Sequence, residues 1–155
     1  MTIRVALVDD QALFRAGIAM LIGSQPDLDV VGEAADGSEV SELVESCRPD
    51  VVLMDVRMSS VDGVTATREL VTTYGDRAPK VLVLTTFDHD EAAASAVEAG
   101  ASGFVLKGAE PEFLLASVRA ATTWLPAASA RSCCAPRRAC RTPRSRRSRS
   151  WPRAP

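Results

Sequence analysis

The chain has 155 residues, of which 46% are hydrophobic, and its formal net charge at pH 7 is −2. This length predicts one domain of ordinary size with a modest extension. The longest apolar runs are of strand length, far below the roughly 20 residues that a membrane-spanning helix needs, and the first residues lack the profile of a signal peptide. We therefore expect a cytoplasmic protein.

Short apolar runs alternate with helical patterns through the first 122 residues. Runs rich in Val and Leu are typical of buried strands in a parallel sheet, and here they predict strands at 3–8, 29–34, 50–55, 80–85 and 103–106. Helices are predicted between them, at about 11–23, 39–46, 64–74, 90–99 and from about 111 onward. This alternation predicts an α/β fold with a doubly wound parallel sheet and helices on both faces.

Several local sequence signals predict where these helices begin and end and which of their residues are buried. Asp36-Gly37-Ser38 predicts a turn and a helix N-cap, residues 88–91 a second cap, and Gly100 a helix end. Cys47 is predicted to be a small buried apolar residue. The apolar residues of the first helix are predicted to share one side: Leu13, Phe14, Ile18, Leu21 and Ile22.

Polar residues stand where four of the predicted strands end. Asp9 and Asp10 follow the first strand, Asp55 closes the third, Thr85 the fourth, and Lys107 follows the fifth. The carboxyl ends of parallel strands meet at one edge of a sheet, where ligands of such folds bind. The sequence therefore predicts three carboxylates, a hydroxyl and an ammonium at one site.

Three carboxylates gathered within about 4–6 Å repel one another by several kcal/mol, so either some of them stay protonated or a cation neutralises them. A small hard cation with few protein ligands is best matched by Mg²⁺. A phosphoryl group could then be held by the metal, by Lys107 and by Thr85, and Asp55 becomes a candidate nucleophile. Asp9 and Asp10 would mainly hold the metal.

Each of these residues alone has an ordinary structural explanation, as a helix cap, a turn residue, a strand end or a solvated lysine. Their joint occurrence at the ends of four strands favours a site. A small doubly wound enzyme or nucleotide binder is the alternative from another class. Against it, Asp9-Asp10-Gln11 stands where a glycine-rich phosphate loop would follow the first strand.

Residues 1–122 resemble the receiver domains of two-component response regulators, and most closely those of the NarL/FixJ (LuxR-type) branch, which usually precede a DNA-binding domain. The resemblance is carried by the strings at residues 5–11, 49–58, 61–63, 81–87 and 99–107. It implies a flavodoxin/CheY-like sheet with the strand order 2-1-3-4-5. One departure is Ser59, where the family commonly has a proline that stiffens the loop.

The resemblance implies roles for the residues around the cluster. Asp55 is similar to the phosphoacceptor, which takes its phosphoryl group from a partner sensor histidine kinase. Asp10 is similar to the direct Mg²⁺ ligand, with Asp9 acting through water. The backbone carbonyl of Arg57 and a carboxylate oxygen of Asp55 complete the protein's ligands. Arg57 and Phe87, both bulky, are hypothesised to shield the phosphorylated side chain from water.

The resemblance also implies a switch. Thr85 and Lys107 are similar to the pair that contacts the phosphoryl group, and Phe104 to the aromatic side chain that changes rotamer when the threonine moves. The alternative for Phe104 is an ordinary core aromatic. The expected output is regulation of transcription without enzymatic turnover of a substrate, and the resemblance allows a homodimer on phosphorylation.

The last part of the chain differs in composition from the rest. Residues 1–126 hold all 20 acidic residues, whereas residues 127–155 hold nine Arg, no Lys and no acidic residue. We expect a receiver domain at 1–124 and a disordered Arg/Pro/Ser/Ala-rich tail at 125–155. Three origins stay open: an out-of-frame product of GC-rich codons, an arm that binds nucleic acid weakly, and a neutral tail. Without a recognisable DNA-binding domain, DNA is expected only through a missing domain or weakly through this tail.

Overall fold

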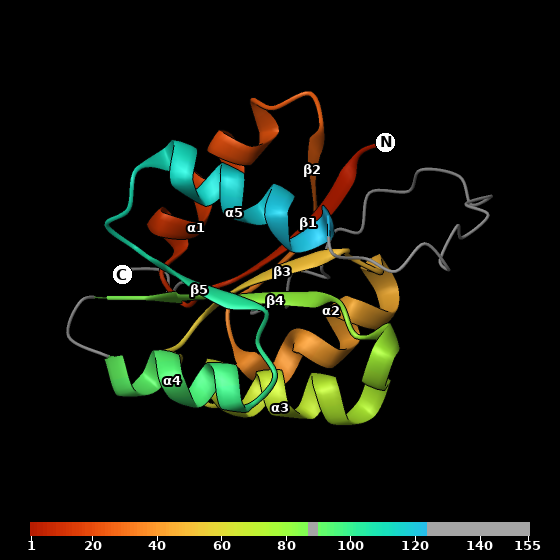
Figure 1. Cartoon of the computed structure of the whole chain (residues 1–155), viewed down its shortest axis with the longest axis vertical. Helices are drawn as coiled ribbons and strands as arrows, with labels where there is room; N and C mark the ends of the chain where they lie inside the picture. The colour runs from red at the N-terminus through yellow and green to blue at the C-terminus, as the bar shows by residue number, and fades with distance from the viewer. Residues whose placement is uncertain (87–89, 124–155) are drawn as a thin grey trace, which may run out of the picture.

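The computed structural model describes residues 1–86 and 90–123. Five strands alternate with five α-helices (Figure 1). The strands are β1 (Ile3–Val8), β2 (Leu28–Ala34), β3 (Val51–Asp55), β4 (Lys80–Thr85) and β5 (Gly103–Leu106). The helices are α1 (Ala12–Gly23), α2 (Val40–Cys47), α3 (Gly63–Tyr74), α4 (Asp90–Glu98) and α5 (Pro111–Thr123), with short 3-10 helices at Gly37–Glu39 and Gly75–Arg77.

The strands form one parallel sheet in the order β2-β1-β3-β4-β5, as predicted. The chain order reverses at β1, which pairs with β2 on one side and with β3 on the other. Val8 pairs with Met54, and Asp55 pairs with Leu84. The carboxyl ends of neighbouring strands therefore lie level, which brings the residues that follow them to the same edge.

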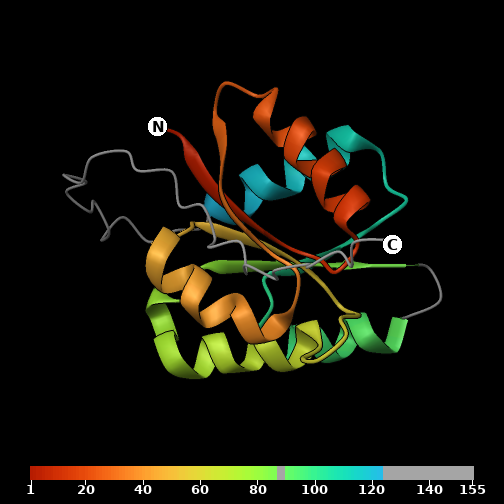
Figure 2. The ribbon, with the colours of Figure 1, turned by 180° about the vertical axis from the view of Figure 1, so that it is seen from behind.

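Helices cover both faces of the sheet. Figures 1 and 2 show α1 and α5 on one face and α2, α3 and α4 on the other. The strands point alternate side chains to the two faces, so that Val5 and Leu7 pack with α1 and α5 whereas Ala6 and Val8 pack with α2 and α3. This double burial explains why β1, β3 and β4 are nearly continuous runs of apolar residues.

Two sequence-based predictions differ in detail from the structure. Leu13 does not share the buried side of α1, since 89% of it is exposed while Ile18 and Ile22 are buried. At about 100° per residue, Leu13 lies roughly 140° around the helix from Ile18, which turns it away from the sheet. The second helix begins as a 3-10 turn at Gly37–Glu39 before α2.

Other predicted features are confirmed. Cys47 is buried against β2, α4 ends just before Gly100, and β2 alternates exposed and buried residues as an edge strand does. The cap predicted at residues 88–91 lies partly outside the described residues. Phe87 and the tail predicted at 125–155 lie wholly outside them. Within the described ranges, no helix has the length and apolar character needed to cross a membrane.

Candidate functional site

Three carboxylates gather at the carboxyl ends of β1 and β3. One oxygen from each of Asp9, Asp10 and Asp55 lies within 4.8 Å of the others. Asp9 and Asp55 are buried, whereas Asp10 is exposed. The two strands are neighbours at the point where the strand order reverses, and this is where doubly wound sheets bind ligands. The predicted convergence of the three side chains is confirmed.

Backbone contacts hold Asp9 in place. Its amide N–H donates to the Ala34 carbonyl (3.2 Å), and its Oδ1 accepts the backbone N–H of Gln11 (2.8 Å). The guanidinium of Arg15, one turn into α1, donates to the Asp9 carbonyl and also pairs with Glu33 (2.9 Å). The Asp9 backbone is therefore anchored to β2, and its carboxylate to the start of α1.

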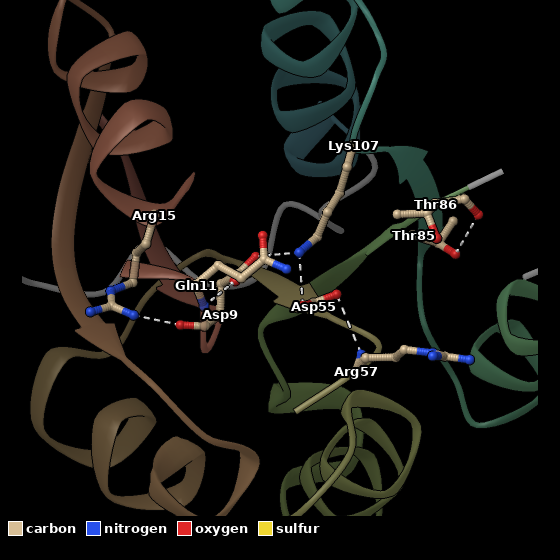
Figure 3. A network of polar contacts seen from close by, with 8 residues as sticks. All are labelled: Asp9, Gln11, Arg15, Asp55, Arg57, Thr85, Thr86 and Lys107. Atoms are coloured by element: carbon tan, nitrogen blue, oxygen red, sulfur yellow. Dashed lines mark hydrogen bonds and ion pairs between the residues drawn. The ribbon is translucent and has the colours of Figure 1, made fainter. Parts of the chain in front are cut away.

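Lys107 bridges two of the carboxylates (Figure 3). Its Nζ lies 2.8 Å from Oδ2 of Asp9 and 2.8 Å from Oδ2 of Asp55, and its side chain is only 11% exposed. The ammonium also lies 4.7 Å from the centre of the Phe14 ring on α1. Opposite charges about 4 Å apart attract by about 4 kcal/mol at an effective dielectric of about 20, so this ammonium offsets much of the carboxylate repulsion.

Burial raises the pKa of the Asp55 carboxyl above its usual value, and the nearby charge of Asp9 adds to this rise, while the hydrogen bond and attraction of Lys107 oppose it. Burial acts to lower the pKa of Lys107, but its hydrogen bonds to Asp55 and Asp9 raise that pKa overall. A second cation beside Asp55 would favour its ionised form further.

Thr85 does not join this network. Its Oγ1 donates to the Thr86 backbone carbonyl (3.2 Å), and in Figure 3 both threonines stand apart from Asp55 and Lys107. Phe104 on the neighbouring strand is 52% exposed, so the interpretation of Phe104 as an ordinary core aromatic is wrong. Among the described residues, the Thr85 hydroxyl thus makes none of the hydrogen bonds to the carboxylates.

Arg57 stands two residues beyond Asp55, in the loop that leads to α3. Its backbone N–H donates to Oδ1 of Asp55 (3.3 Å), and its side chain is exposed. Gly63 closes this loop against the end of β3, since a Cβ at Gly63 would lie 2.1 Å from the Asp55 carbonyl oxygen. Only glycine allows α3 to start this close to Asp55.

The donor set suits a small divalent cation. Three carboxylates with one neutralising ammonium leave an excess of negative charge, and carboxylate and carbonyl oxygens are the ligands that Mg²⁺ prefers. The oxygens are already within reach of a common centre. The acidic cluster therefore fits a metal of this kind.

Sequence reasoning missed two of the residues that shape the site. Arg15 and Phe14 lie on α1 and reach Asp9 and Lys107 respectively. Helical spacing marked Phe14 only as an apolar position, and nothing in the sequence marked Arg15. Their contacts depend on how α1 packs against the sheet, which local patterns do not describe.

An open parallel sheet in the order 2-1-3-4-5 with an acidic cluster and a lysine at its carboxyl edge defines the receiver class of signalling domains. The sequence profile of the response regulator receiver domain matches residues 5–119, and the chain belongs to this family.

The relatives narrow the class to the NarL/LuxR type. The chain is 40% identical over 124 residues to the transcriptional regulatory protein LiaR of Bacillus subtilis, covering 80% of this chain and 58% of that protein. It is 35% identical over 117 residues to the nitrate/nitrite response regulator NarL of Escherichia coli strain K12, covering 76% and 53%. The solved receiver domain of a putative NarL from Mycobacterium tuberculosis superposes with a TM-score of 0.73 at 32% identity, covering 79% of this chain and 98% of that domain.

The chain thus spans little more than half the length of these curated regulators. The matched part is the receiver domain, and the relatives are transcriptional regulators rather than enzymes. The alternatives of a doubly wound enzyme, a nucleotide binder or a protein acting through a basic tail find no support among them.

Proposed function

We propose that this receiver accepts a phosphoryl group on Asp55 from a partner sensor histidine kinase, in a reaction that depends on Mg²⁺. The observation that carries the proposal is the bridge from Lys107 to Asp9 and Asp55, with Asp10 close by, at the carboxyl edge of the sheet. Family membership supplies the reaction class, because two-component receivers take their phosphoryl group from phosphohistidine.

The transfer balances without further reactants. A carboxylate oxygen of Asp55 forms the new P–O bond while the P–N bond of phosphohistidine breaks, and the electron pair stays on the departing imidazole nitrogen, which takes up a proton. Lys107 offsets charge on the phosphoryl oxygens as it now offsets charge on Asp55. Its short contact to Asp9 holds it beside the acceptor.

Asp9, Asp10, Asp55 and the Arg57 carbonyl are the proposed metal ligands, with Asp9 acting through water. A bound Mg²⁺ supplies charge neutralisation for the acceptor and for the incoming phosphoryl oxygens. The position of Arg57 supports its part in the set, since its N–H already contacts Asp55 in the loop that follows the acceptor.

The proposed response begins at Thr85 and Phe104. The Thr85 hydroxyl now donates to the Thr86 carbonyl, and a phosphoryl group on Asp55 offers it a stronger, charged acceptor. Turning toward that acceptor would vacate space beside β5 into which the half-exposed Phe104 ring could rotate. The phosphorylated state would thereby favour one arrangement of the surface formed by α4, β5 and α5.

The output follows from the relatives. We propose that the phosphorylated receiver regulates transcription in the cytoplasm, with homodimer formation on phosphorylation, through a DNA-binding domain outside the matched part, since that part covers only 58% of LiaR and 53% of NarL. We propose a domain boundary near residue 124, and the described part of α5 extends to Thr123. No turnover of an external substrate is proposed.

The direct test is phosphorylation with a small phosphodonor. The full chain incubated with acetyl phosphate and Mg²⁺ is expected to gain the mass of one phosphoryl group, and the peptide that contains Asp55 should carry it. Asp55→Asn should abolish the gain, because the amide is a far weaker nucleophile than the carboxylate. Chelation of Mg²⁺ should also prevent it.

Asp50→Asn is the matched control. Asp50 stands just before the same strand, at the opposite edge of the sheet, and its carboxylate accepts the Arg4 backbone N–H (2.8 Å). This variant should be phosphorylated like the parent protein. A modified Asp55→Asn variant, or an unmodified parent protein that is fully folded, would reject the proposal.

A further inference from the structure

One carboxylate outside the acidic cluster reaches the loop that follows the acceptor. Asp36 lies in the turn after β2, and its Oδ1 accepts the backbone N–H of Ser38 (3.0 Å) within that turn. The same side chain extends to residues 24 and 25 positions further along the chain. Its Oδ2 accepts the N–H of Ser60 (2.7 Å), and its Oδ1 also accepts the N–H of Val61 (3.2 Å).

The backbones of the two segments touch beside this carboxylate. A Cβ at Gly37 would lie 2.4 Å from the Val61 carbonyl oxygen, so the turn and the loop meet at a distance that only glycine permits. Asp36 and Gly37 therefore form one clasp on the loop, with hydrogen bonds from the first and close backbone packing from the second.

Met58 and Val61 of the loop between β3 and α3 pack against the core, but the other hydrogen bonds of the loop among the described residues lie near its ends. Val56 donates its N–H to the Leu84 carbonyl (3.1 Å), and Gly63 donates to the Val56 carbonyl (2.9 Å). Asp62 caps α3 by accepting the N–H of Thr65 (2.8 Å). Ser59 and Ser60, which lie between these anchors, carry no ring or branch that restricts the backbone. The clasp from Asp36 supplies long-range hydrogen bonds to the middle of the loop.

We propose that Asp36 is a positioning residue that holds the loop at residues 57–61 so that the Arg57 carbonyl is preorganised to bind the divalent cation. The inference rests on the proposed function and adds a residue to it. A ligand fixed before binding does not lose conformational freedom when the cation arrives, so preorganisation raises affinity. The backbone hydrogen bonds of Ser38 and Ser60, which are the largest influences, lower the pKa of Asp36 to about 2, so the carboxylate is an ionised acceptor at neutral pH.

Two substitutions separate the clasp from the charge. Asp36→Asn removes the charge but keeps an Oδ1 that accepts from Ser38 and Val61, whereas its NH₂ group cannot accept the Ser60 N–H. Asp36→Ala removes the same charge and all three bonds. Isothermal titration of the full-length variants with MgCl₂ should show Mg²⁺ affinity falling by about threefold for Asn and by about tenfold for Ala. If the charge alone mattered, the two variants would bind equally.

A second readout follows the loop itself. Amide hydrogen exchange of Ser60 and Val61 should be faster in both variants without Mg²⁺, and faster in the Ala variant than in the Asn variant for Val61. Asp27→Asn is the matched control, since Asp27 is a partly exposed carboxylate that accepts two hydrogen bonds from Arg119 at the opposite edge of the sheet. It should change neither Mg²⁺ affinity nor the exchange of these amides.

The outcomes are distinct. Unchanged Mg²⁺ affinity in folded Asp36→Asn and Asp36→Ala, alongside a parent protein that binds Mg²⁺ and is phosphorylated, overturns the role of Asp36 alone. Equal weakening in both variants overturns it too, because it assigns the effect to charge. A folded parent protein that binds no Mg²⁺ overturns both this inference and the proposed function. Thermal unfolding of each variant establishes that it is folded.

Discussion

Lys107 occupies the place where a cation is expected. Its ammonium contacts Asp9 and Asp55, two of the three proposed carboxylate ligands of the metal, at 2.8 Å each. A divalent cation among the same oxygens would repel the ammonium, so Lys107 and the metal act against each other at Asp9. We therefore expect the lysine to stabilise the cluster without metal and to lower its affinity for metal.

Replacing Lys107 by methionine should separate these effects. Methionine preserves the long apolar stem beside Phe14, while loss of the ammonium leaves Asp9 and Asp55 as uncompensated buried carboxylates. Removing one partner of a buried ion pair typically costs about 3–5 kcal/mol. Lys107→Met should therefore melt at a lower temperature without Mg²⁺, bind Mg²⁺ at least about tenfold more tightly, and accept phosphoryl groups more slowly.

Lys80→Met is the control, because Lys80 begins β4 at the opposite edge of the sheet. It should leave the Mg²⁺-induced rise in melting temperature unchanged, whereas Lys107→Met should enlarge that rise. A variant of Lys107 whose Mg²⁺ affinity is unchanged would show that the ammonium does not compete with the metal.

At the scale of elements, the start of α3 is packed directly on the end of β3. Gly63 lets the helix begin against the Asp55 carbonyl, and Val56 receives the Gly63 N–H at 2.9 Å. The position of the first residue of α3 is therefore fixed relative to the end of β3. Glycine is required at this junction by close approach rather than by an unusual backbone angle.

Gly63→Ala should be destabilising by at least about 2–3 kcal/mol, because the new methyl group must displace the Asp55 backbone. Gly17→Ala in α1 is the matched change, since a Cβ there meets nothing within 4 Å. It should stabilise the protein by about 0.5–1 kcal/mol through helix propensity. Urea unfolding of both variants measures the difference, and equal effects would contradict the close-contact argument.

At the scale of the whole molecule, two apolar clusters account for the fold. One lies between the sheet and α2, α3 and α4, and the other between the sheet and α1 and α5. Among the residues that the structure describes, their members run from Ile3 to Ala121. These two clusters each lie between the sheet and its helices, so we predict that the receiver folds without the residues beyond α5.

Cutting the chain after Thr123 should preserve a single cooperative transition with an unchanged midpoint in urea. Cutting before Pro111 should abolish it, because Leu114, Leu115 and Val118 complete the second cluster. Far-ultraviolet circular dichroism follows both transitions. If the first truncation fails to fold while the full chain folds, the proposed boundary near residue 124 is wrong.

The amino-acid sequence by itself determined the architecture and the location of the site at one edge of the sheet. Apolar runs of three or four residues, at 5–8, 51–54, 81–84 and 104–106, specify the buried strands. The polar residues directly after them identify the edge where Asp9, Asp10, Asp55 and Lys107 meet. These features are local, because side-chain periodicity and chain connectivity govern them.

Only the tertiary structure decided which of the neighbouring groups pair. Lys107 bridges Asp9 and Asp55, Thr85 donates to a backbone carbonyl instead of joining them, and Leu13 faces away from the core. Asp36, which the sequence marked as a turn residue, reaches a loop 24 residues away. Such contacts depend on how the packed strands and helices bring together donors and acceptors that are distant in the sequence. Where one donor has several acceptors nearby, the assembled sheet determines which of them it contacts.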